Sequence, residues 1–301
     1  MMKQGWRSDT VYPASDCQPD KRSSGAKAMT DMDRRTITLL ALLAPFTPLA
    51  SGPVMGQVPE HKLPDNGEEM SSVPWMGDEQ IAMLIYPGMT VMDLIGPHCM
   101  FSALMGAKID LVASSLDPVT SDAGVTLIPT ATFQSCPRDL TILFTPGGTD
   151  GTLAAASDSE TLAFLADRGA WAKYITSVCS GSLLLGAAGL LKGYRATSHW
   201  SCRDALAGFG AIPTDARVVR DRNRITGAGV TAGLDFGLSM VAELRGRIYA
   251  ECTQLMGEYD PQPPFNAGSL RTASADVRTA MVEMAADFTR KAEALAGLQQ
   301  N

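Results

Sequence analysis

Residues 174–191 read YITSVCSGSLLLGAAGLL, and the rest of the chain is organised around this segment. Five β-favouring residues lead to Cys179, and small residues then open an apolar, Leu/Ala-rich run, which predicts a strand, a sharp turn and a helix. Such a turn holds a nucleophile out from the backbone at the carboxyl end of a sheet, and the helix dipole favours the thiolate form of Cys179. Cysteine is also common as a small buried residue, so this segment alone leaves a nucleophilic and a structural interpretation open.

The composition is that of a chain with ample material for a globular core. Of 301 residues, 45% are hydrophobic and 19% are charged, which fits one compact α/β domain after a leader. The formal net charge is -7 and no long basic run is present, so we expect no nucleic-acid partner. Four nearby arginines are interrupted by Asp221 and Asn223, and we interpret them as a solvated hairpin turn: Arg217, Arg220, Arg222 and Arg224.

Residues 1–52 have the features of an N-terminal extension with an export signal. Arg34 and Arg35 precede the apolar run 37–50, and small residues follow it, which predicts a twin-arginine signal and a periplasmic location. The run is too short and too interrupted by proline for stable membrane insertion. If the segment is instead a disordered tail, the protein is cytoplasmic. The proline-rich, polar residues 53–79 are predicted to be a linker.

Strand and helix patterns alternate over the rest of the chain. The expected strands are 81–85, 108–114, 140–144 and 174–178, with a hairpin at 218–226, and the expected helices are 90–105, 157–172, 231–259 and 274–295. This alternation predicts an α/β fold with a doubly wound sheet sandwiched by helices. We assign residues 80–270 to this domain and residues 271–301 to a C-terminal helix.

Polar or flexible residues follow two of the predicted strands. Asp93 stands near the start of the first helix, where it suits the helix dipole as a capping residue but also occupies a place where α/β folds put catalytic groups. Gly147 and Gly148 follow the strand 140–144, and a glycine pair allows close approach of a ligand to backbone amides. An oxyanion hole and a plain tight turn remain open for this pair, and the dinucleotide motif GxGxxG is absent.

The histidines and cysteines do not form a recognisable metal motif. His199 is interpreted as a core or interface histidine rather than a proton donor. No CxxC motif or zinc-type spacing occurs, so no metal site is expected. Beyond the predicted signal five cysteines remain, an odd number that leaves at least one thiol unpaired unless chains are cross-linked: Cys99, Cys136, Cys179, Cys202 and Cys252.

An ordered series of motifs over residues 80–270 resembles the DJ-1/PfpI superfamily, and within it the isonitrile hydratases. The motifs are Pro87-Gly88, Asp93-Leu94-Ile95-Gly96-Pro97, Pro146-Gly147-Gly148, Ser177-Val178-Cys179-Ser180-Gly181, Gly189-Leu190-Leu191-Lys192-Gly193, Ala196-Thr197-Ser198-His199-Trp200 and Asp260-Pro261-Gln262-Pro263-Pro264-Phe265. The resemblance implies a flavodoxin-like sandwich, usually a homodimer. It also implies a nucleophilic Cys179 on a strained elbow, with the Asp93 carboxylate near its sulfur. Ser180 stands where threonine is typical.

The same resemblance implies a hydro-lyase that adds water to an isocyanide without a metal or organic cofactor. In that chemistry Cys179 attacks the terminal carbon, Asp93 delivers a proton, and a thioimidate is hydrolysed to an N-substituted formamide. The developing charge would be held by the loop at Gly147 and Gly148 and by Ser180. Two alternatives stay open: another cysteine-dependent activity of the superfamily, such as a glyoxalase or a hydrolase, and a non-catalytic small-molecule or stress-response binding domain.

Overall fold

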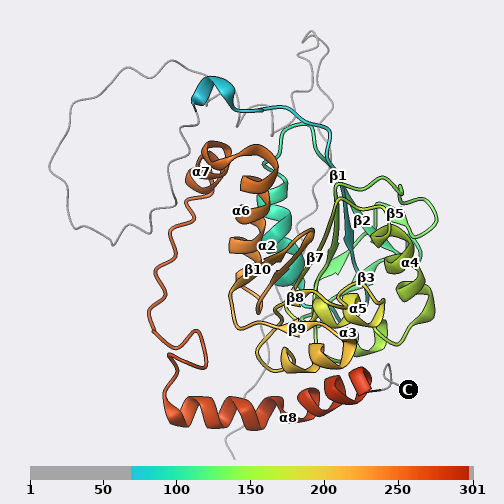
Figure 1. Ribbon diagram of the computed structural model, residues 1–301, viewed down its shortest axis with the longest axis vertical. Coiled ribbons are helices and arrows are strands. Elements are labelled where there is room, and N and C mark those ends of the chain that lie inside the picture. Colours follow the sequence, from blue (N-terminus) through green and yellow to red (C-terminus); the bar gives the residue numbers. More distant parts are fainter. Residues whose placement is uncertain (1–68, 298–301) are drawn as a thin grey trace, which may run out of the picture. The chain divides into compact units, whose positions relative to one another are not determined.

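The computed structural model describes residues 69–297 (Figure 1). The predicted export signal, residues 53–68 of the predicted linker and residues 298–301 lie outside the described residues. The predictions made for those segments therefore stay predictions.

A seven-stranded sheet forms the centre of the described chain. Its strand order is β10-β11-β7-β6-β1-β2-β5, and every neighbouring pair is parallel except β10 and β11. The central strands are almost continuously apolar and buried because helices cover both of their faces. The strand bounds are β1 Gln80–Leu84, β2 Lys108–Ala113, β5 Ala131–Thr132, β6 Ile142–Thr145, β7 Tyr174–Val178, β10 Val218–Asp221 and β11 Arg224–Gly227.

Helices lie on the two sides of this sheet (Figure 1). On one side α2 (Val91–Phe101) packs against α6 (Ala232–Arg245), where a Cβ atom on Gly237 would come within 2.9 Å of Met100 Cβ. On the other side α5 (Gly181–Ala187) packs on β6 and β7 beside α3 (Asp150–Ala155) and α4 (Ser159–Gly169). The predicted doubly wound α/β fold is confirmed.

The order of the strands creates a switch point beside β1. The chain runs from β1 to β2 in one direction and later returns to β6 on the opposite side of β1. Crossovers on the two sides of such a point lie on opposite faces, which leaves a crevice at the carboxyl ends of the strands. The loops that follow β1, β6 and β7 all begin at this edge of the sheet.

Two predicted helices differ from the structure. The prediction of one helix over 231–259 is wrong, because Gly246 adopts φ 85° and ψ 169° and separates α6 from α7 (Arg247–Met256). This backbone conformation is accessible almost only to glycine and cannot continue a helix. The helix predicted at 157–172 is shorter in the structure, where it is α4. Asp158 caps its start, because the Asp158 side chain accepts a hydrogen bond from the Thr161 amide. The separate helix α3 precedes it.

The last residues of the predicted linker contact the domain. The Trp75 and Tyr249 rings lie 5.3 Å apart, and the Gly77 amide donates to the Met105 carbonyl. Glu79 forms a buried ion pair with Arg245, whose guanidinium also donates to the Pro74 carbonyl. Residues 73–79 are thus held at the end of α6.

The remaining elements are short strands, two 3-10 helices and a C-terminal helix. Strands β3 (Val119–Thr120) and β4 (Thr126–Leu127) pair with each other, as do β8 (Arg195–Ala196) and β9 (Ile212–Pro213). The 3-10 helices are η2 (Met70–Ser72) and η3 (Asp204–Phe209), and α8 (Ala275–Gly297) matches the predicted final helix. Within residues 69–297, no helix combines the length and apolar character that a bilayer crossing requires.

Candidate active site

The predicted site residues lie together at the carboxyl edge of the sheet. Asp93 is in the first turn of α2, Gly147 and Gly148 follow β6, and Cys179 follows β7. The Thr90 amide donates to the Gly147 carbonyl at 2.8 Å, so the loop after β1 is tied to the loop after β6. Residues separated by more than 80 positions in the chain therefore meet because their parallel strands end at the same edge.

Cys179 occupies the strained turn that the sequence predicts. Its φ is 58°, an uncommon conformation for a residue other than glycine, and its surroundings hold it there. The Cys179 amide donates to the carbonyl of Ala228 at 2.8 Å, and its carbonyl accepts from the Ser198 hydroxyl at 2.9 Å. The residue is buried, with 6% of its surface exposed, so only a small reactant can reach the sulfur without a rearrangement.

The carboxyl group of Asp93 faces the thiol of Cys179. Asp93 Oδ2 accepts the Gly147 amide at 3.1 Å. Among the described residues, Oδ1 has no partner that meets hydrogen-bond geometry, although it is buried. Burial raises the pKa of Asp93 from 3.8 to about 7, and this effect outweighs the lowering by the Cys179 side chain and the Gly147 amide. Near neutral pH the group can therefore both donate and accept a proton.

The protonation of Cys179 differs from the sequence expectation. The helix dipole predicts a stabilised thiolate, but burial and the nearby Asp93 charge raise the pKa of Cys179 well above its ordinary value. The Ser180 and Val230 amides lower this pKa, yet burial dominates. Helix α5 has only seven residues, which limits what its dipole can offset. The resting sulfur is thus a thiol, and its activation requires a base.

The glycine pair allows the loop after β6 to lie close to Ser180 and Asp93. A Cβ atom on Gly147 would lie 2.6 Å from the Ser180 amide nitrogen and 2.9 Å from Asp93 Oδ2. The Gly147 amide already donates to Asp93, and the Gly148 amide donates to the Ser180 hydroxyl at 2.9 Å. These two amides hold the site residues in place, so a substrate anion would compete with bonds that exist within the protein.

Ser180 belongs to a buried hydroxyl network that local sequence signals do not reveal. Its hydroxyl donates to the Gly148 carbonyl at 2.6 Å and lies 3.1 Å from the Thr152 hydroxyl. The Tyr86 hydroxyl lies 2.9 Å from Thr152 and donates to the Pro146 carbonyl. Ser180 is fully buried, and its hydroxyl positions the loop after β6 while its amide lies at the sulfur.

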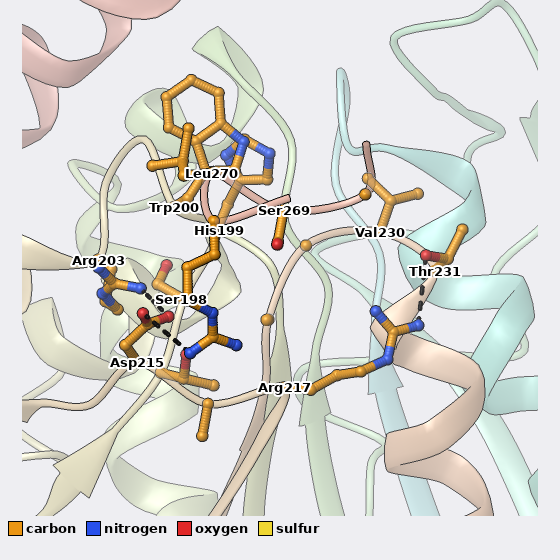
Figure 2. A pocket seen from close by; sticks show the side chains of 16 residues that line it. Ser198, His199, Trp200, Arg203, Asp215, Arg217, Val230, Thr231, Ser269 and Leu270 are labelled. Atoms are coloured by element: carbon orange, nitrogen blue, oxygen red, sulfur yellow. Dashed lines mark hydrogen bonds and ion pairs between the residues drawn. The ribbon is translucent and has the colours of Figure 1, made fainter. Parts of the chain in front are cut away.

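Figure 2 shows a cavity of about 370 Å³ whose lining includes Ser198 and Ala228, which hydrogen-bond the backbone of Cys179; Cys179 itself does not line it. Its walls come from the segment after β8, the loops before β10 and after β11, and the segment 268–271: Thr197, Ser198, His199, Trp200, Arg203, Asp215, Ala216, Arg217, Ala228, Gly229, Val230, Thr231, Gly268, Ser269, Leu270 and Arg271. The hairpin predicted around Asp221 is present. Arg217 directly precedes the hairpin; its side chain is about half exposed, lines the cavity and pairs with Asp235 at 2.5 Å.

His199 lies on the wall of this cavity and is only partly buried. Its Nδ1 is 2.7 Å from the Ser201 hydroxyl, and its ring packs 5.1 Å from the Trp200 ring. Burial lowers the pKa of His199, which favours the neutral imidazole at neutral pH. His199 therefore contributes shape and a hydrogen bond to the cavity rather than a charge.

The described residues contain no cluster of three or more His, Cys, Asp or Glu side chains that could hold a metal ion. The five cysteines between residues 69 and 297 are all unpaired thiols. Cys136 and Cys202 are buried like Cys179, and only Cys99 is exposed.

The fold and the site define the class of the protein: an α/β sandwich with a cysteine on a strand-to-helix turn and a carboxyl group beside it. The sequence profile of the DJ-1/PfpI family matches residues 79–243, more than half of the chain. The chain belongs to the DJ-1/PfpI family.

Individual relatives support the assignment to the same family. The chain is 48% identical over 198 residues to an isonitrile hydratase from Pseudomonas putida, covering 66% of this chain and 86% of the relative. It is similar to the crystal structure of a THiJ/PfpI family protein from Pseudomonas syringae, with 81% identity, a TM-score of 0.75, and coverage of 79% of this chain and 98% of the other. A DJ-1 superfamily protein from Salmonella typhimurium is 27% identical with a TM-score of 0.53, covering 61% of this chain and all of the other.

Proposed function

We propose that the protein is an isonitrile hydratase that converts an isocyanide and water into an N-substituted formamide. The observation that carries the proposal is the buried Asp93 carboxyl group at the Cys179 thiol, with a pKa of about 7. The isonitrile hydratase from Pseudomonas putida, which covers two thirds of the chain, supports the choice of substrate class.

The first step forms a carbon–sulfur bond. As Cys179 Sγ attacks the terminal carbon of R–N≡C, the ionised Asp93 removes the thiol proton and delivers it to that carbon, which gives the thioimidate R–N=CH–S–Cys179. The raised pKa of both groups fits this step, because the proton starts on sulfur and Asp93 needs only to relay it.

The second step releases the product. Asp93 takes a proton from water as the oxygen adds to the thioimidate carbon, and it passes this proton to the nitrogen. Collapse of the adduct breaks the carbon–sulfur bond and frees R–NH–CHO, while the proton of the adduct's hydroxyl group moves to the sulfur of Cys179. Ser180 contributes its amide at the sulfur, where negative charge appears when the bond breaks.

Two substitutions test this mechanism. We expect Cys179→Ala to abolish turnover of an alkyl isocyanide, and Asp93→Asn to lower kcat by roughly 10² to 10⁴-fold because the amide cannot relay a proton. Asn keeps an oxygen that can accept the Gly147 amide, so the fold is retained. Cys99→Ala, at an exposed thiol, is the matched control. Formamide production is followed by NMR, and wild-type rates in either site variant would refute the mechanism.

The same assay separates the alternatives. Methylglyoxal, supplied in place of the isocyanide, is converted to lactate if the protein is a glyoxalase. A binding domain transforms neither compound. Formamide without lactate is the result that the proposal predicts.

We also propose that the protein is exported and forms a homodimer. Export rests on Arg34, Arg35 and the apolar run 37–50, and we expect Arg34→Lys/Arg35→Lys to keep the protein in the cytoplasm. Cell fractionation checks this expectation. The dimer rests on resemblance to the superfamily, and light scattering of the purified protein at twice the chain mass would support it.

A further inference from the structure

The hairpin of β3 and β4 lies against the loop that leads into α2. The Gly88 amide donates to the Thr120 carbonyl at 2.9 Å, and the Asp122 amide donates to the Met89 carbonyl at 2.9 Å. Met89 also forms an antiparallel bridge with Gly148. The hairpin, the loop after β1 and the glycine pair are therefore joined through their backbones.

Thr90 connects this hairpin to the start of α2. It is the N-cap residue of the helix, a position where a threonine hydroxyl ordinarily accepts an amide of the first turn. The Thr90 hydroxyl makes no such cap and instead donates to Asp122 Oδ2 at 2.6 Å. Its backbone serves the active site, because the Thr90 amide donates to the Gly147 carbonyl and the Thr90 carbonyl accepts the Asp93 amide at 3.1 Å. A carboxylate on the hairpin thus fixes the residue that ties Asp93 to the loop after β6.

The turn of the hairpin holds Asp122 in this place. Ser121 is buried, its amide donates to the Val125 carbonyl at 2.8 Å, and its hydroxyl accepts the Val125 amide at 3.0 Å. Gly124 completes the turn with φ 81°, a conformation that glycine adopts readily. Asp122 itself is exposed, so the Thr90 hydroxyl rather than packing orients its side chain.

Asp122 also supplies a negative charge near Asp93. Titratable side chains that interact electrostatically with Asp93 come from four other parts of the fold: Tyr86, Asp122, Cys179 and Cys202. Burial raises the pKa values of Tyr86, Cys179 and Cys202, so these three side chains are neutral near pH 7. Burial is also the main cause of the raised pKa of Asp93, and the charge of Asp122 raises it further.

We propose that Asp122 is a positioning residue for Asp93: through Thr90 it fixes the start of α2 beside the glycine pair, and it keeps a negative charge close to the proton relay. Because a like charge disfavours ionisation, Asp122 delays the loss of the Asp93 proton as the pH rises. The inference rests on the proposed hydratase function for the reaction, and it adds to the site a residue from outside the strand-to-helix turns.

An NMR titration tests the charge without any turnover. The carboxyl carbon of Asp93 is followed against pH in protein that carries ¹³C-labelled aspartate, and Asp93→Asn identifies its signal. We expect Asp122→Asn to lower the midpoint for Asp93 by about 0.5 from its value of about 7, while the Asn oxygen still accepts the Thr90 hydroxyl. Added salt should lower the wild-type midpoint more than that of Asp122→Asn, because salt screens the charge that the variant lacks. Asp117→Asn, at an exposed aspartate that bonds Ser115, is the matched control.

Kinetics with an alkyl isocyanide then connects Asp122 to the proposed reaction. Since the ionised Asp93 starts that reaction, kcat/KM rises with pH through the pKa of Asp93. We expect Asp122→Asn to move this rise to lower pH, so that kcat/KM at pH 6, relative to its value at pH 8, is about 2- to 3-fold higher than in the wild type. Thr90→Val removes the hydrogen bond and keeps the charge, so kcat should fall about 10-fold, and Thr90→Ser, which keeps the hydroxyl, should restore it.

The outcomes separate this role from the hydratase function. An unchanged Asp93 midpoint in Asp122→Asn, or the same change in Asp117→Asn, would overturn the role of the Asp122 charge whatever compound is converted. Wild-type kcat in Thr90→Val would overturn the positioning through Thr90. If no isocyanide is converted while the midpoint moves as expected, the hydratase function fails and the effect of Asp122 on Asp93 stands.

Discussion

At the scale of single residues, the buried carboxyl group of Asp93 links catalysis to stability. Its pKa is raised from 3.8 to about 7 in the folded protein. A raised pKa means that the folded state binds the proton more tightly than the unfolded state. The stability associated with this group is therefore fully present below about pH 4 and is lost as the pH rises through 7.

Asp93→Asn removes this pH dependence. A pKa difference of about 3 corresponds to about 4 kcal/mol. As the pH rises from 4 to 8, we therefore expect the unfolding free energy of the wild type to fall by up to about 4 kcal/mol relative to that of Asp93→Asn. Urea titrations across this range measure the difference. Asp158→Asn is a control of opposite sign, because hydrogen bonds from Thr161 lower the pKa of Asp158 and its stabilisation is lost toward acid pH. Parallel wild-type and Asp93→Asn curves would contradict the prediction.

The sequence predicts the site residues better than it predicts their environment. Asp93, Gly147, Gly148 and Cys179 each follow a recognisable strand, so a shared position at the carboxyl edge can be inferred from topology. The hydrogen-bond partners of Ser180 cannot be inferred in this way, because they are distant in the sequence. Thr152 lies 28 residues from Ser180, and the hydroxyl of Thr152 contacts that of Tyr86, a further 66 residues away. The raised pKa of Cys179 likewise depends on burial by the assembled fold, which the local helix signal does not contain.

At the scale of elements, Gly246 shows how one backbone conformation divides a continuous pattern. The residues on both sides favour a helix, so the sequence predicts a single element. The helix ends at Arg245, which forms the buried ion pair with Glu79, and the next residue takes φ 85°. The end of α6 thus coincides with a backbone conformation that only glycine adopts readily.

Substitution at Gly246 tests this account. We expect Gly246→Ala to lower the unfolding free energy by roughly 1–3 kcal/mol, since a side chain is strained in that conformation. Gly257→Ala is the matched control, because Gly257 also ends a helix but has φ -83°, and a Cβ atom there would make only ordinary van der Waals contacts, the nearest at 3.5 Å to the Thr253 carbonyl oxygen. Urea midpoints of the two variants provide the measurement. An equal loss in both would mean that the turn at residue 246 is not the constraint.

At the scale of the molecule, the C-terminal half of α8 is bound to the domain while its N-terminal half is largely exposed. Ala292 and Ala296 are buried, and a Cβ atom on Gly208 would lie 2.6 Å from the Ala296 Cβ. In the other half Met284 is 75% exposed, and Val282 is also exposed. The amphipathic pattern of the sequence predicts α8 itself. Which half of this helix packs against the domain depends on the surface that η3 presents.

The hydroxyl of Thr289 connects α8 to the cavity. It donates to the Ser201 carbonyl at 2.7 Å, and Ser201 in turn holds the His199 ring on the cavity wall. We expect Thr289→Val to cost about 1 kcal/mol of stability, because one hydrogen bond is lost, and to speed amide exchange between residues 199 and 209. Thr279→Val, on the exposed half of α8, should change neither quantity. Thermal unfolding and hydrogen exchange are measured on both variants.

Identical exchange in residues 199–209 would show that α8 packs against the domain without supporting the cavity wall. Faster exchange in Thr289→Val alone would instead make α8 a structural part of the site, although none of its residues lines the cavity.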